Sequence, residues 1–132
     1  MEKLAEGYGL VEGPIWVPGQ GLLYSDVLNG GVFCVDRQGN ITTVFAYRKG
    51  IGGMSVHENG GMIVSGRNIS WKSVPEGDTI TVLDQNKAAG LIGFNDITTD
   101  DVGRIYAGAL GSSPVFEDGR EPQSARLRMA YS

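Results

Sequence analysis

Trp16-Val17-Pro18-Gly19-Gln20-Gly21-Leu22-Leu23-Tyr24-Ser25 is the first of three similar stretches in this chain of 132 residues. The second is Val56-His57-Glu58-Asn59-Gly60-Gly61-Met62-Ile63-Val64-Ser65, and the third is Thr99-Asp100-Asp101-Val102-Gly103-Arg104-Ile105-Tyr106-Ala107-Gly108. Each contains a strand-like run, a polar turn with glycine, and a second strand-like run, because glycine readily adopts the positive φ that such turns need. The copies are offset by 40 and 43 residues. A period near 40 residues predicts the blades of a β-propeller, which are small four-stranded sheets.

The segments between these stretches supply the remaining strands of each blade. Apolar spacing typical of a helix is not sustained anywhere, so we expect little helix. The predicted fold class is all-β, a partial β-propeller of about two and a half blades. Beyond the repeated hairpins we expect strands at residues 31–36 and 41–46 in the first copy, 53–56, 69–73 and 79–83 in the second, and 95–98 and 126–130 in the third.

The repeat also predicts the domain organisation. We expect a single truncated propeller sector, with blade one at about residues 11–46, blade two at about 51–84 and a partial blade three at about 94–132. Closed propellers have about four to eight blades, so this number of blades cannot close a ring. We therefore expect a fragment, a truncated product, or a subunit whose missing sector comes from other copies. Open strands and apolar flanks recruit partners, which makes self-association through open blade edges a further expectation.

Composition narrows the classes of partner and location. The formal net charge of −4, the isoelectric point near 4.9 and the lack of a Lys/Arg cluster argue against a nucleic-acid surface. No run approaches the roughly 18 apolar residues of a membrane span, and residues 1–7 do not resemble a signal peptide, so we expect a cytoplasmic protein without membrane contact. Cys34 is the only cysteine and lies in an apolar strand, which predicts a buried thiol.

Carrying the repeat four residues upstream places Glu12, Gly52 and Asn95 at one structural level. The innermost strands of a propeller run along its axis, so residues at one level of successive blades face a shared channel. A carboxylate and an amide oxygen suit a hard cation, with Ca²⁺ most favoured and Mg²⁺, Mn²⁺ or Zn²⁺ as alternatives; Zn²⁺ would normally recruit His or Cys as well. Arg67 follows the second strand of blade two and is a weaker candidate for binding a substrate carboxylate.

Each candidate also has a structural explanation that the sequence leaves open. Glu12 precedes Gly-Pro and fits a solvated loop, and Asn95 precedes Asp96 and fits a turn cap. Arg67 fits a surface loop. Two further arrangements are weaker: Ser55 with His57 as nucleophile and base, and a calcium loop around residues 96–101, whose spacing fails the EF-hand pattern. Trp16 and Trp71 are expected to pack between blades.

The chain resembles the senescence marker protein / gluconolactonase / luciferin-regenerating enzyme family over about residues 7–120. The motifs that carry the resemblance are Glu12-Gly13-Pro14-Ile15-Trp16, Leu22-Leu23-Tyr24-Ser25-Asp26, Gly31-Val32-Phe33, Phe94-Asn95-Asp96 and Asp101-Val102-Gly103-Arg104-Ile105-Tyr106-Ala107-Gly108. The resemblance implies a six-bladed propeller that binds a divalent cation on its axis and hydrolyses sugar lactones and related esters. It also implies that Glu12 is a metal ligand and that Asn95 lies near substrate and metal.

Two departures from the family limit what the resemblance carries over. Several members have an Arg two residues before the Asn, where this chain has Gly93, so their polyhydroxy-acid specificity does not transfer. The other metal ligands of the family, an Asn and an Asp, lie in later blades, and that Asp would be the general base. The resemblance therefore implies an N-terminal fragment of a metal-dependent lactonase that acts on a small-molecule lactone or sugar-acid ester, with no complete catalytic set and no activity alone. The alternative is a non-enzymatic binding or self-assembly module.

Overall fold

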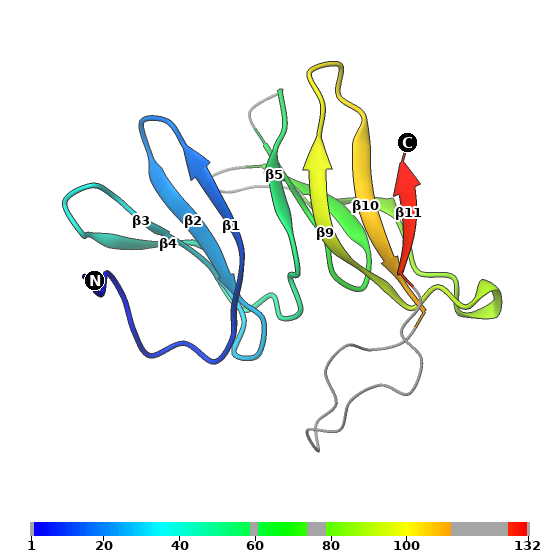
Figure 1. The fold of residues 1–132 in the computed structure, drawn as a ribbon, viewed down its shortest axis with the longest axis horizontal. Helices are drawn as coiled ribbons and strands as arrows, with labels where there is room; N and C mark the ends of the chain where they lie inside the picture. Colours follow the sequence, from blue (N-terminus) through cyan, green and yellow to red (C-terminus); the bar gives the residue numbers. More distant parts are fainter. Residues whose placement is uncertain (1, 59–60, 74–78, 112–126, 132) are drawn as a thin grey trace.

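The computed structural model describes residues 2–58, 61–73, 79–111 and 127–131, the last range by its backbone alone. These residues form three antiparallel sheets, which Figure 1 shows side by side, and one short 3₁₀ turn, η1 (Lys87–Ala89). The strands of the first sheet, in order, are β1 (Val11–Val17), β2 (Gly21–Asp26), β3 (Val32–Val35) and β4 (Ile41–Phe45). The second sheet contains β5 (Met54–Val56), β6 (Met62–Val64), β7 (Ile69–Lys72) and β8 (Thr79–Leu83). In the third, β10 (Ile105–Leu110) lies between β9 (Gly93–Thr99) and β11 (Leu127–Tyr131).

The fold class predicted from the repeat is confirmed. The regular secondary structure of the described residues is almost entirely antiparallel strands, and these begin and end within about two residues of their predicted limits. The turn between β5 and β6 includes residues 59–60, which lie outside the described residues. On either side of it, the backbone N–H of His57 donates a 2.8 Å hydrogen bond to the carbonyl of Gly61.

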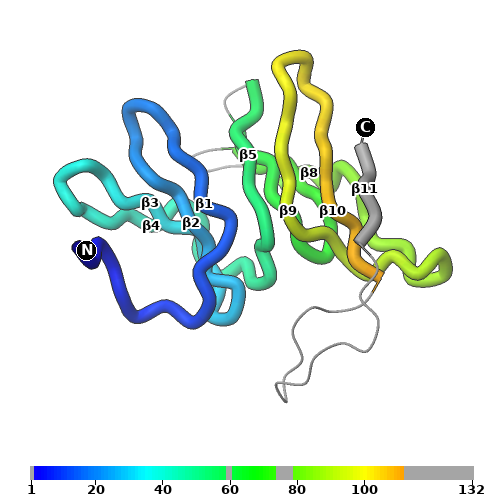
Figure 2. Tube along the Cα trace, viewed as in Figure 1, coloured from blue at the N-terminus to red at the C-terminus, as the bar shows by residue number. Residues whose placement is uncertain are grey.

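The innermost strands of the three sheets lie next to one another. Figures 1 and 2 show β5 between β1 and β9, with the other strands of each sheet fanning outward. Each sheet proceeds from its innermost strand outward in chain order, which is the meander connection of propeller blades. The arrangement is a sector of a β-propeller, so residues from three distant parts of the chain meet at the inner strands.

Two apolar clusters join the sheets. The first lies between the first and second sheets, and the second lies between the second and third. The buried residues of the first cluster are Leu23, Val32, Cys34, Ile51, Met54, Met62 and Val64. Those of the second are Ile63, Ile69, Phe94, Ile105, Ala107 and Ala109. Because β6 alternates its side chains, Met62 and Val64 face one cluster and Ile63 faces the other, so the second sheet carries both interfaces.

A buried serine fastens each of the first two sheets to the sheet that follows it. Ser25 Oγ lies 2.8 Å from the carbonyl oxygen of Ile51 and 3.0 Å from that of Glu12. Ser65, its equivalent in the repeat, donates from Oγ to the carbonyl oxygen of Asn95. Both serines are fully buried, so their hydroxyls need these partners. The two bonds hold the backbone of the inner strands in a fixed relation.

The segment before β1 covers the outer side of the first sheet. The Tyr8 ring packs edge-on against Tyr24 at 5.1 Å between centroids and lies 5.2 Å from the ring of Phe33, and its hydroxyl is 2.7 Å from the Tyr24 hydroxyl. This contact and burial raise the pKa of Tyr24 well above its usual value, with burial as the larger cause. The first sheet therefore has aromatic packing on the side away from the second sheet.

The tryptophan prediction is correct for one residue and wrong for the other. Trp71 packs against the cluster between the second and third sheets. Trp16 is 48% exposed, and the Arg37 guanidinium lies 5.3 Å from the centre of its ring. Trp16 stands near the end of β1, at the rim of the sheet, where the cation covers part of the ring that no neighbouring sheet reaches.

The buried thiol predicted at Cys34 is confirmed, because only 7% of that residue is exposed and burial raises the pKa of its thiol.

Within the part of the chain that the structure describes, no helix has the length and apolar character needed to cross a membrane.

Candidate functional site

A pocket of about 360 Å³ lies at the end of the sector where the inner strands begin. It forms there because the chain enters each inner strand and leaves each second strand at the same end of the sheets. Its lining residues are Leu10, Glu12, Val27, Gly50, Gly52, Gly66, Arg67, Ile92, Gly93, Phe94, Asn95 and Leu110. All three side chains that the sequence singled out, Glu12, Asn95 and Arg67, are among them. The structure therefore brings the candidates together, while their chemical roles stay predictions.

Most of the lining follows the repeat. Glu12, Gly52 and Asn95 all line the pocket, as the repeat predicts, and two further sets of equivalent residues join them; Gly66, Ile92 and Phe94 are the remaining lining residues. Two residues before each of these positions are Leu10, Gly50 and Gly93. At or just after the end of each second strand are Val27, Arg67 and Leu110. The pocket is thus the place where three positions of the repeat, each present in three copies, converge.

The strands that carry Glu12 and Asn95 have the same irregularity. In β1, three steps from Glu12 to Ile15 oppose two steps on β2, and in β9, three steps from Phe94 to Ile97 oppose two on β10. Each is a β-bulge, which turns a side chain away from regular alternation and often occurs beside functional sites. The inner strand of the second sheet, β5, pairs regularly with β6. The bulges therefore mark the two strands that contribute a polar side chain.

Gly52 occupies the pocket without a side chain because Asn95 lies against it. A Cβ atom built at Gly52 would lie 2.5 Å from Asn95 Oδ1 and 3.3 Å from the Asn95 Cα. Real Cβ atoms do not approach an oxygen so closely, so any larger residue would displace the amide. The second sheet thus contributes the space that the Asn95 side chain uses.

Backbone hydrogen bonds between segments fix the walls of the pocket. The N–H of Val27 donates to the Leu10 carbonyl at 2.8 Å, and that of Gly50 donates to the Val27 carbonyl at 3.0 Å. On the opposite wall, Ile92 donates to the Leu110 carbonyl at 3.0 Å, and Phe94 N–H donates to the carbonyl of Gly66. The walls are therefore parts of the folded sheets and do not depend on a free loop.

A buried carboxylate holds the segment that leads into Glu12. Asp26 is 2% exposed and accepts hydrogen bonds from the backbone N–H groups of Gly9, Leu10, Leu28 and Asn29 and from the Asn29 amide. Burial alone would raise the pKa of Asp26, but these donors outweigh it and lower the pKa to about 2. Asp26 is therefore ionised at neutral pH and fixes the position of Leu10 in the pocket wall.

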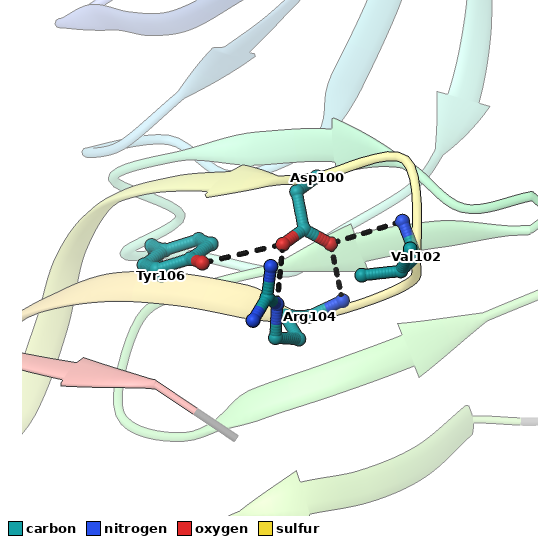
Figure 3. A network of polar contacts seen from close by, with 4 residues as sticks. All are labelled: Asp100, Val102, Arg104 and Tyr106. Carbon is teal, nitrogen blue, oxygen red and sulfur yellow. Dashed lines mark hydrogen bonds and ion pairs between the residues drawn. The ribbon is translucent and has the colours of Figure 1, made fainter.

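The two weaker alternatives, a calcium loop around residues 96–101 and a catalytic pair at Ser55 and His57, include residues with structural contacts. Asp100 accepts hydrogen bonds from the backbone N–H of Val102 at 3.1 Å, from the backbone N–H and Nε of Arg104, and from the Tyr106 hydroxyl at 3.2 Å, as Figure 3 shows. It closes the turn between β9 and β10, as expected of an Asp in a tight turn. Ser55 Oγ lies 2.8 Å from Thr99 Oγ1, which links β5 to β9.

Two side-chain oxygen groups in the pocket are of the kind that ligate a hard cation. The Glu12 carboxylate and the Asn95 amide oxygen are the ligand types that such cations prefer. Among the described residues, no group of three or more His, Cys, Asp or Glu side chains gathers closely enough to hold a metal. Glu12 and Asn95 thus fit two positions of a coordination shell whose remaining positions need water, substrate or other protein groups.

Most of the pocket wall was not predicted from the sequence, and neither were the two serines that fasten neighbouring sheets. The repeat contained a signal for the wall, because the residues two before Glu12, Gly52 and Asn95 all line the pocket. Ser25 and Ser65 were equally visible as a matched pair two positions before Val27 and Arg67. Their role appears only once the next sheet is in place.

Comparisons with known proteins agree with the fold and the motifs. Residues 10–127 match the model of the SMP-30/Gluconolactonase/LRE-like region. Among solved structures, a gluconolactonase from Xanthomonas campestris superposes with a TM-score of 0.77 at 18% identity, covering 97% of this chain and 45% of that one. A candidate gluconolactonase superposes with a TM-score of 0.69 at 19% identity, covering 96% of this chain and 51% of that one.

The chain therefore spans about half the length of the solved structures that it matches. These identities are low, so the superpositions support the fold alone. No curated protein gave a significant sequence match. The family match covers most of the chain and includes the Glu12, Phe94 and Asn95 motifs. This chain belongs to the SMP-30/gluconolactonase/LRE-like family.

Proposed function

We propose that this chain is the N-terminal part of a divalent-metal-dependent lactone hydrolase, and that Glu12 and Asn95 bind its cation. The observation that carries the proposal is the convergence of these side chains from separate sheets in one pocket. Membership of the SMP-30/gluconolactonase/LRE-like family supports the reaction class, and the oxygen ligands favour Ca²⁺, with Mg²⁺, Mn²⁺ and Zn²⁺ as alternatives. The proposed substrate is a small-molecule lactone or sugar-acid ester.

Glu12 and Asn95 have different tasks in this proposal. The Glu12 carboxylate provides the negative charge that attracts the cation into the pocket. Asn95, fixed against Gly52, supplies a neutral oxygen to the cation and orients a lactone or an attacking water beside it. When bound, the cation would polarise the lactone carbonyl and lower the pKa of a coordinated water. Hydrolysis adds one water and breaks the ring C–O bond, and a carboxylate and a hydroxyl are the products.

The described part of the pocket supplies no base for this reaction. Beyond Glu12, the described lining of the pocket contains no carboxylate or imidazole that could accept the proton of the attacking water. If Glu12 binds the cation, its charge serves the cation and the reaction needs another base. We therefore propose that the 132-residue chain binds the cation weakly and has negligible lactonase activity alone. Arg67, which is exposed at the pocket, would meet the carboxylate of the product.

Calorimetric titration of the metal-free chain with Ca²⁺, Mg²⁺ and Mn²⁺ tests the cation site. We expect weak binding that Glu12→Gln reduces at least about tenfold, because the substitution removes the charged ligand and keeps its shape. Glu58→Gln is the matched control, since Glu58 is also exposed and lies outside the pocket lining. Equal binding by wild type and Glu12→Gln would contradict the proposal.

Activity is tested separately with glucono-δ-lactone. The expected result is no cation-dependent hydrolysis above the spontaneous rate by a monomeric sample. Cation-dependent turnover that Glu12→Gln abolishes would refute the proposed inactivity and retain the lactonase assignment. Cation-dependent turnover unaffected by Glu12→Gln would contradict the assigned role of Glu12.

Self-association is a second proposed property, favoured by the outer strand of the second sheet. β8 is the edge strand of that sheet, and every one of its residues is exposed, including Ile80 at 56% and Val82 at 43%. An apolar edge strand can pair with another chain. Sedimentation equilibrium should show concentration-dependent association that Ile80→Lys abolishes. Leu28→Lys, at a turn residue that is also about half exposed, should leave the association intact. A strictly monomeric wild type would exclude the property.

We also propose a cytoplasmic location. Cys34 is the only cysteine, and it is buried, so the chain forms no internal disulfide of the kind common in secreted domains. Fractionation of cells that express the untagged protein tests this proposal, and recovery in the secreted fraction would contradict it.

A further inference from the structure

The pocket walls differ in chemistry from the level that carries Glu12 and Asn95. Apart from glycines, the walls consist of five apolar side chains and one guanidinium. The apolar residues are Leu10, Val27, Ile92, Phe94 and Leu110. Four of them are only partly buried, so their hydrocarbon surface faces the pocket instead of disappearing into the cores; Phe94 is the exception at 2% exposure. Apolar surface of this kind gains free energy when a ligand covers it.

A polyhydroxylated lactone would find few partners on these walls. Each hydroxyl that loses water without gaining a hydrogen bond costs about 1–3 kcal/mol. The side-chain donors and acceptors in the described lining are Glu12, Asn95 and Arg67. The first two serve the proposed cation, which leaves Arg67 alone for substrate hydroxyls. The carbonyl groups of Leu10, Val27, Gly66 and Leu110 already accept backbone bonds.

Close backbone approach also keeps the position of Gly93 free of a polar side chain. A Cβ atom at Gly93 would lie 2.9 Å from the carbonyl oxygen of Gly66, and the N–H of Phe94 donates to that same carbonyl. A larger residue would have to displace a peptide group that is held by a hydrogen bond. The wall is therefore apolar for two reasons: most of its side chains are apolar, and the backbone leaves no room for a polar side chain at position 93.

We propose that the described walls of this pocket select lactones that carry an alkyl substituent over polyhydroxylated lactones. This inference rests on the proposed function, since it takes the pocket as the lactone site and names the substrate class. In the bound state, the lactone ring lies toward Glu12 and Asn95. The alkyl chain lies along the side chains of Leu10, Val27 and Leu110. The opened product is a hydroxy acid with an apolar tail.

Binding to the intact 132-residue chain tests the inference without requiring turnover. The probes are δ-decalactone, δ-valerolactone and freshly dissolved glucono-δ-lactone, titrated by ligand-observed NMR with and without Ca²⁺. We expect δ-decalactone to bind at least about tenfold more tightly than δ-valerolactone, because covering about two methylene groups accounts for that factor. Glucono-δ-lactone should bind more weakly than δ-decalactone. Equal affinity for the first two, or tighter binding of glucono-δ-lactone, would overturn the inference.

Variants of the wall locate the effect. Leu110→Ala should weaken δ-decalactone binding about fivefold and leave δ-valerolactone unchanged, because only the tail reaches that wall. Leu10→Ala repeats the test on the opposite wall and serves if the first variant does not fold. Leu28→Ala is the matched control, because Leu28 is 48% exposed and outside the pocket lining. A loss that is equal for both lactones, or equal for the control, would contradict the assignment.

Glu12→Gln separates this inference from the proposed function. The variant should lose cation binding and keep the preference for the alkyl chain. A tail preference in a chain that binds no cation supports apolar selection and contradicts the proposed cation site. Cation binding through Glu12 with no tail preference supports the cation site and overturns apolar selection.

Discussion

The inner strands of the first and third sheets differ from that of the second in one respect that decides the pocket. β1 and β9 each have a bulge at their polar residue, Glu12 or Asn95, whereas β5 pairs regularly and is preceded by Gly52. The same repeat position thus contributes an oxygen in two sheets and an open space in one. The difference shows that copies of one structural unit divide the work of a site, and that the copy without a side chain matters as much as the others.

The residue before the polar position is buried in the third sheet and exposed in the first. Substitution of the buried residue should have the largest effect on the free energy of unfolding. Phe94, before Asn95, is 2% exposed between two sheets, whereas Val11, before Glu12, is 49% exposed. Phe94→Ala should lower the free energy of unfolding by about 3–5 kcal/mol, as cavity-forming substitutions do. Val11→Ala should change it by less than about 1 kcal/mol. Urea unfolding measures both, and similar losses would remove the contrast between the copies.

The next largest effect is the loss of stability at low pH, which involves Asp26 in the first sheet. The folded-state pKa of Asp26 is about 2, below its usual value of 3.8, so ionised Asp26 stabilises the fold above pH 4. That stabilisation should disappear as the pH falls from about 4 through 2, and it amounts to about 2 kcal/mol. Unfolding titrations should show a flatter pH dependence for Asp26→Asn than for wild type in this range. Identical slopes would mean that Asp26 does not hold the segment before β1.

Gly52 allows the contrast between the bulged and regular strands to be tested in the site itself. Gly52→Ala would place its Cβ 2.5 Å from Asn95 Oδ1, which is too close for a real contact, so the amide must turn away. If Asn95 is a ligand, affinity for the preferred cation should fall about tenfold, equivalent to about 1.4 kcal/mol. Gly39→Ala is the control for a glycine-to-alanine change outside the pocket lining, because its Cβ would meet no atom within 4 Å, although its positive φ of 85° adds strain. Unchanged affinity in Gly52→Ala would indicate that Asn95 does not bind the cation.

The smallest expected effect distinguishes the two serine contacts. Ser25→Ala and Ser65→Ala should each lower the free energy of unfolding by about 1 kcal/mol, since each leaves buried carbonyl groups with one donor fewer. Ser65→Ala should also weaken cation binding, because Ser65 holds the backbone of Asn95. Hydrogen exchange at β5 and β9 would show which inner strand each substitution loosens. Loosening of the same strand in both variants would contradict the assignment of one serine to each junction.

Much of the fold was predictable because the repeat is a local pattern. Strand, glycine turn and strand recur in order, and glycine turns constrain the chain wherever they occur. The same register predicted that Glu12, Gly52 and Asn95 would share a level, and all three line one pocket. Their roles in binding or catalysis remain predictions.

The features that sequence reasoning missed depend on contacts between distant segments. A bulge requires two strands to be counted against each other, so β1 alone gives no sign of it. The apolar wall combines Leu10 and Val27, which flank the first hairpin, with Leu110 from the third sheet. Trp16 was assigned to an interface because tryptophan is large and apolar, but its position at the rim places it under Arg37 instead. In each case the deciding fact is which segment lies next to the residue.

The serine contacts also bear on how such an array of sheets grows by gene duplication. Ser25 and Ser65 each belong to one blade and reach forward to the backbone of the next, so the fastening is encoded within the unit that is copied. A newly duplicated blade would inherit a ready-made attachment to its successor before any side chains between them had adapted. The third copy has Gly108 at this position. Whatever follows that copy in an ancestral or engineered array must dock without the inherited hydroxyl.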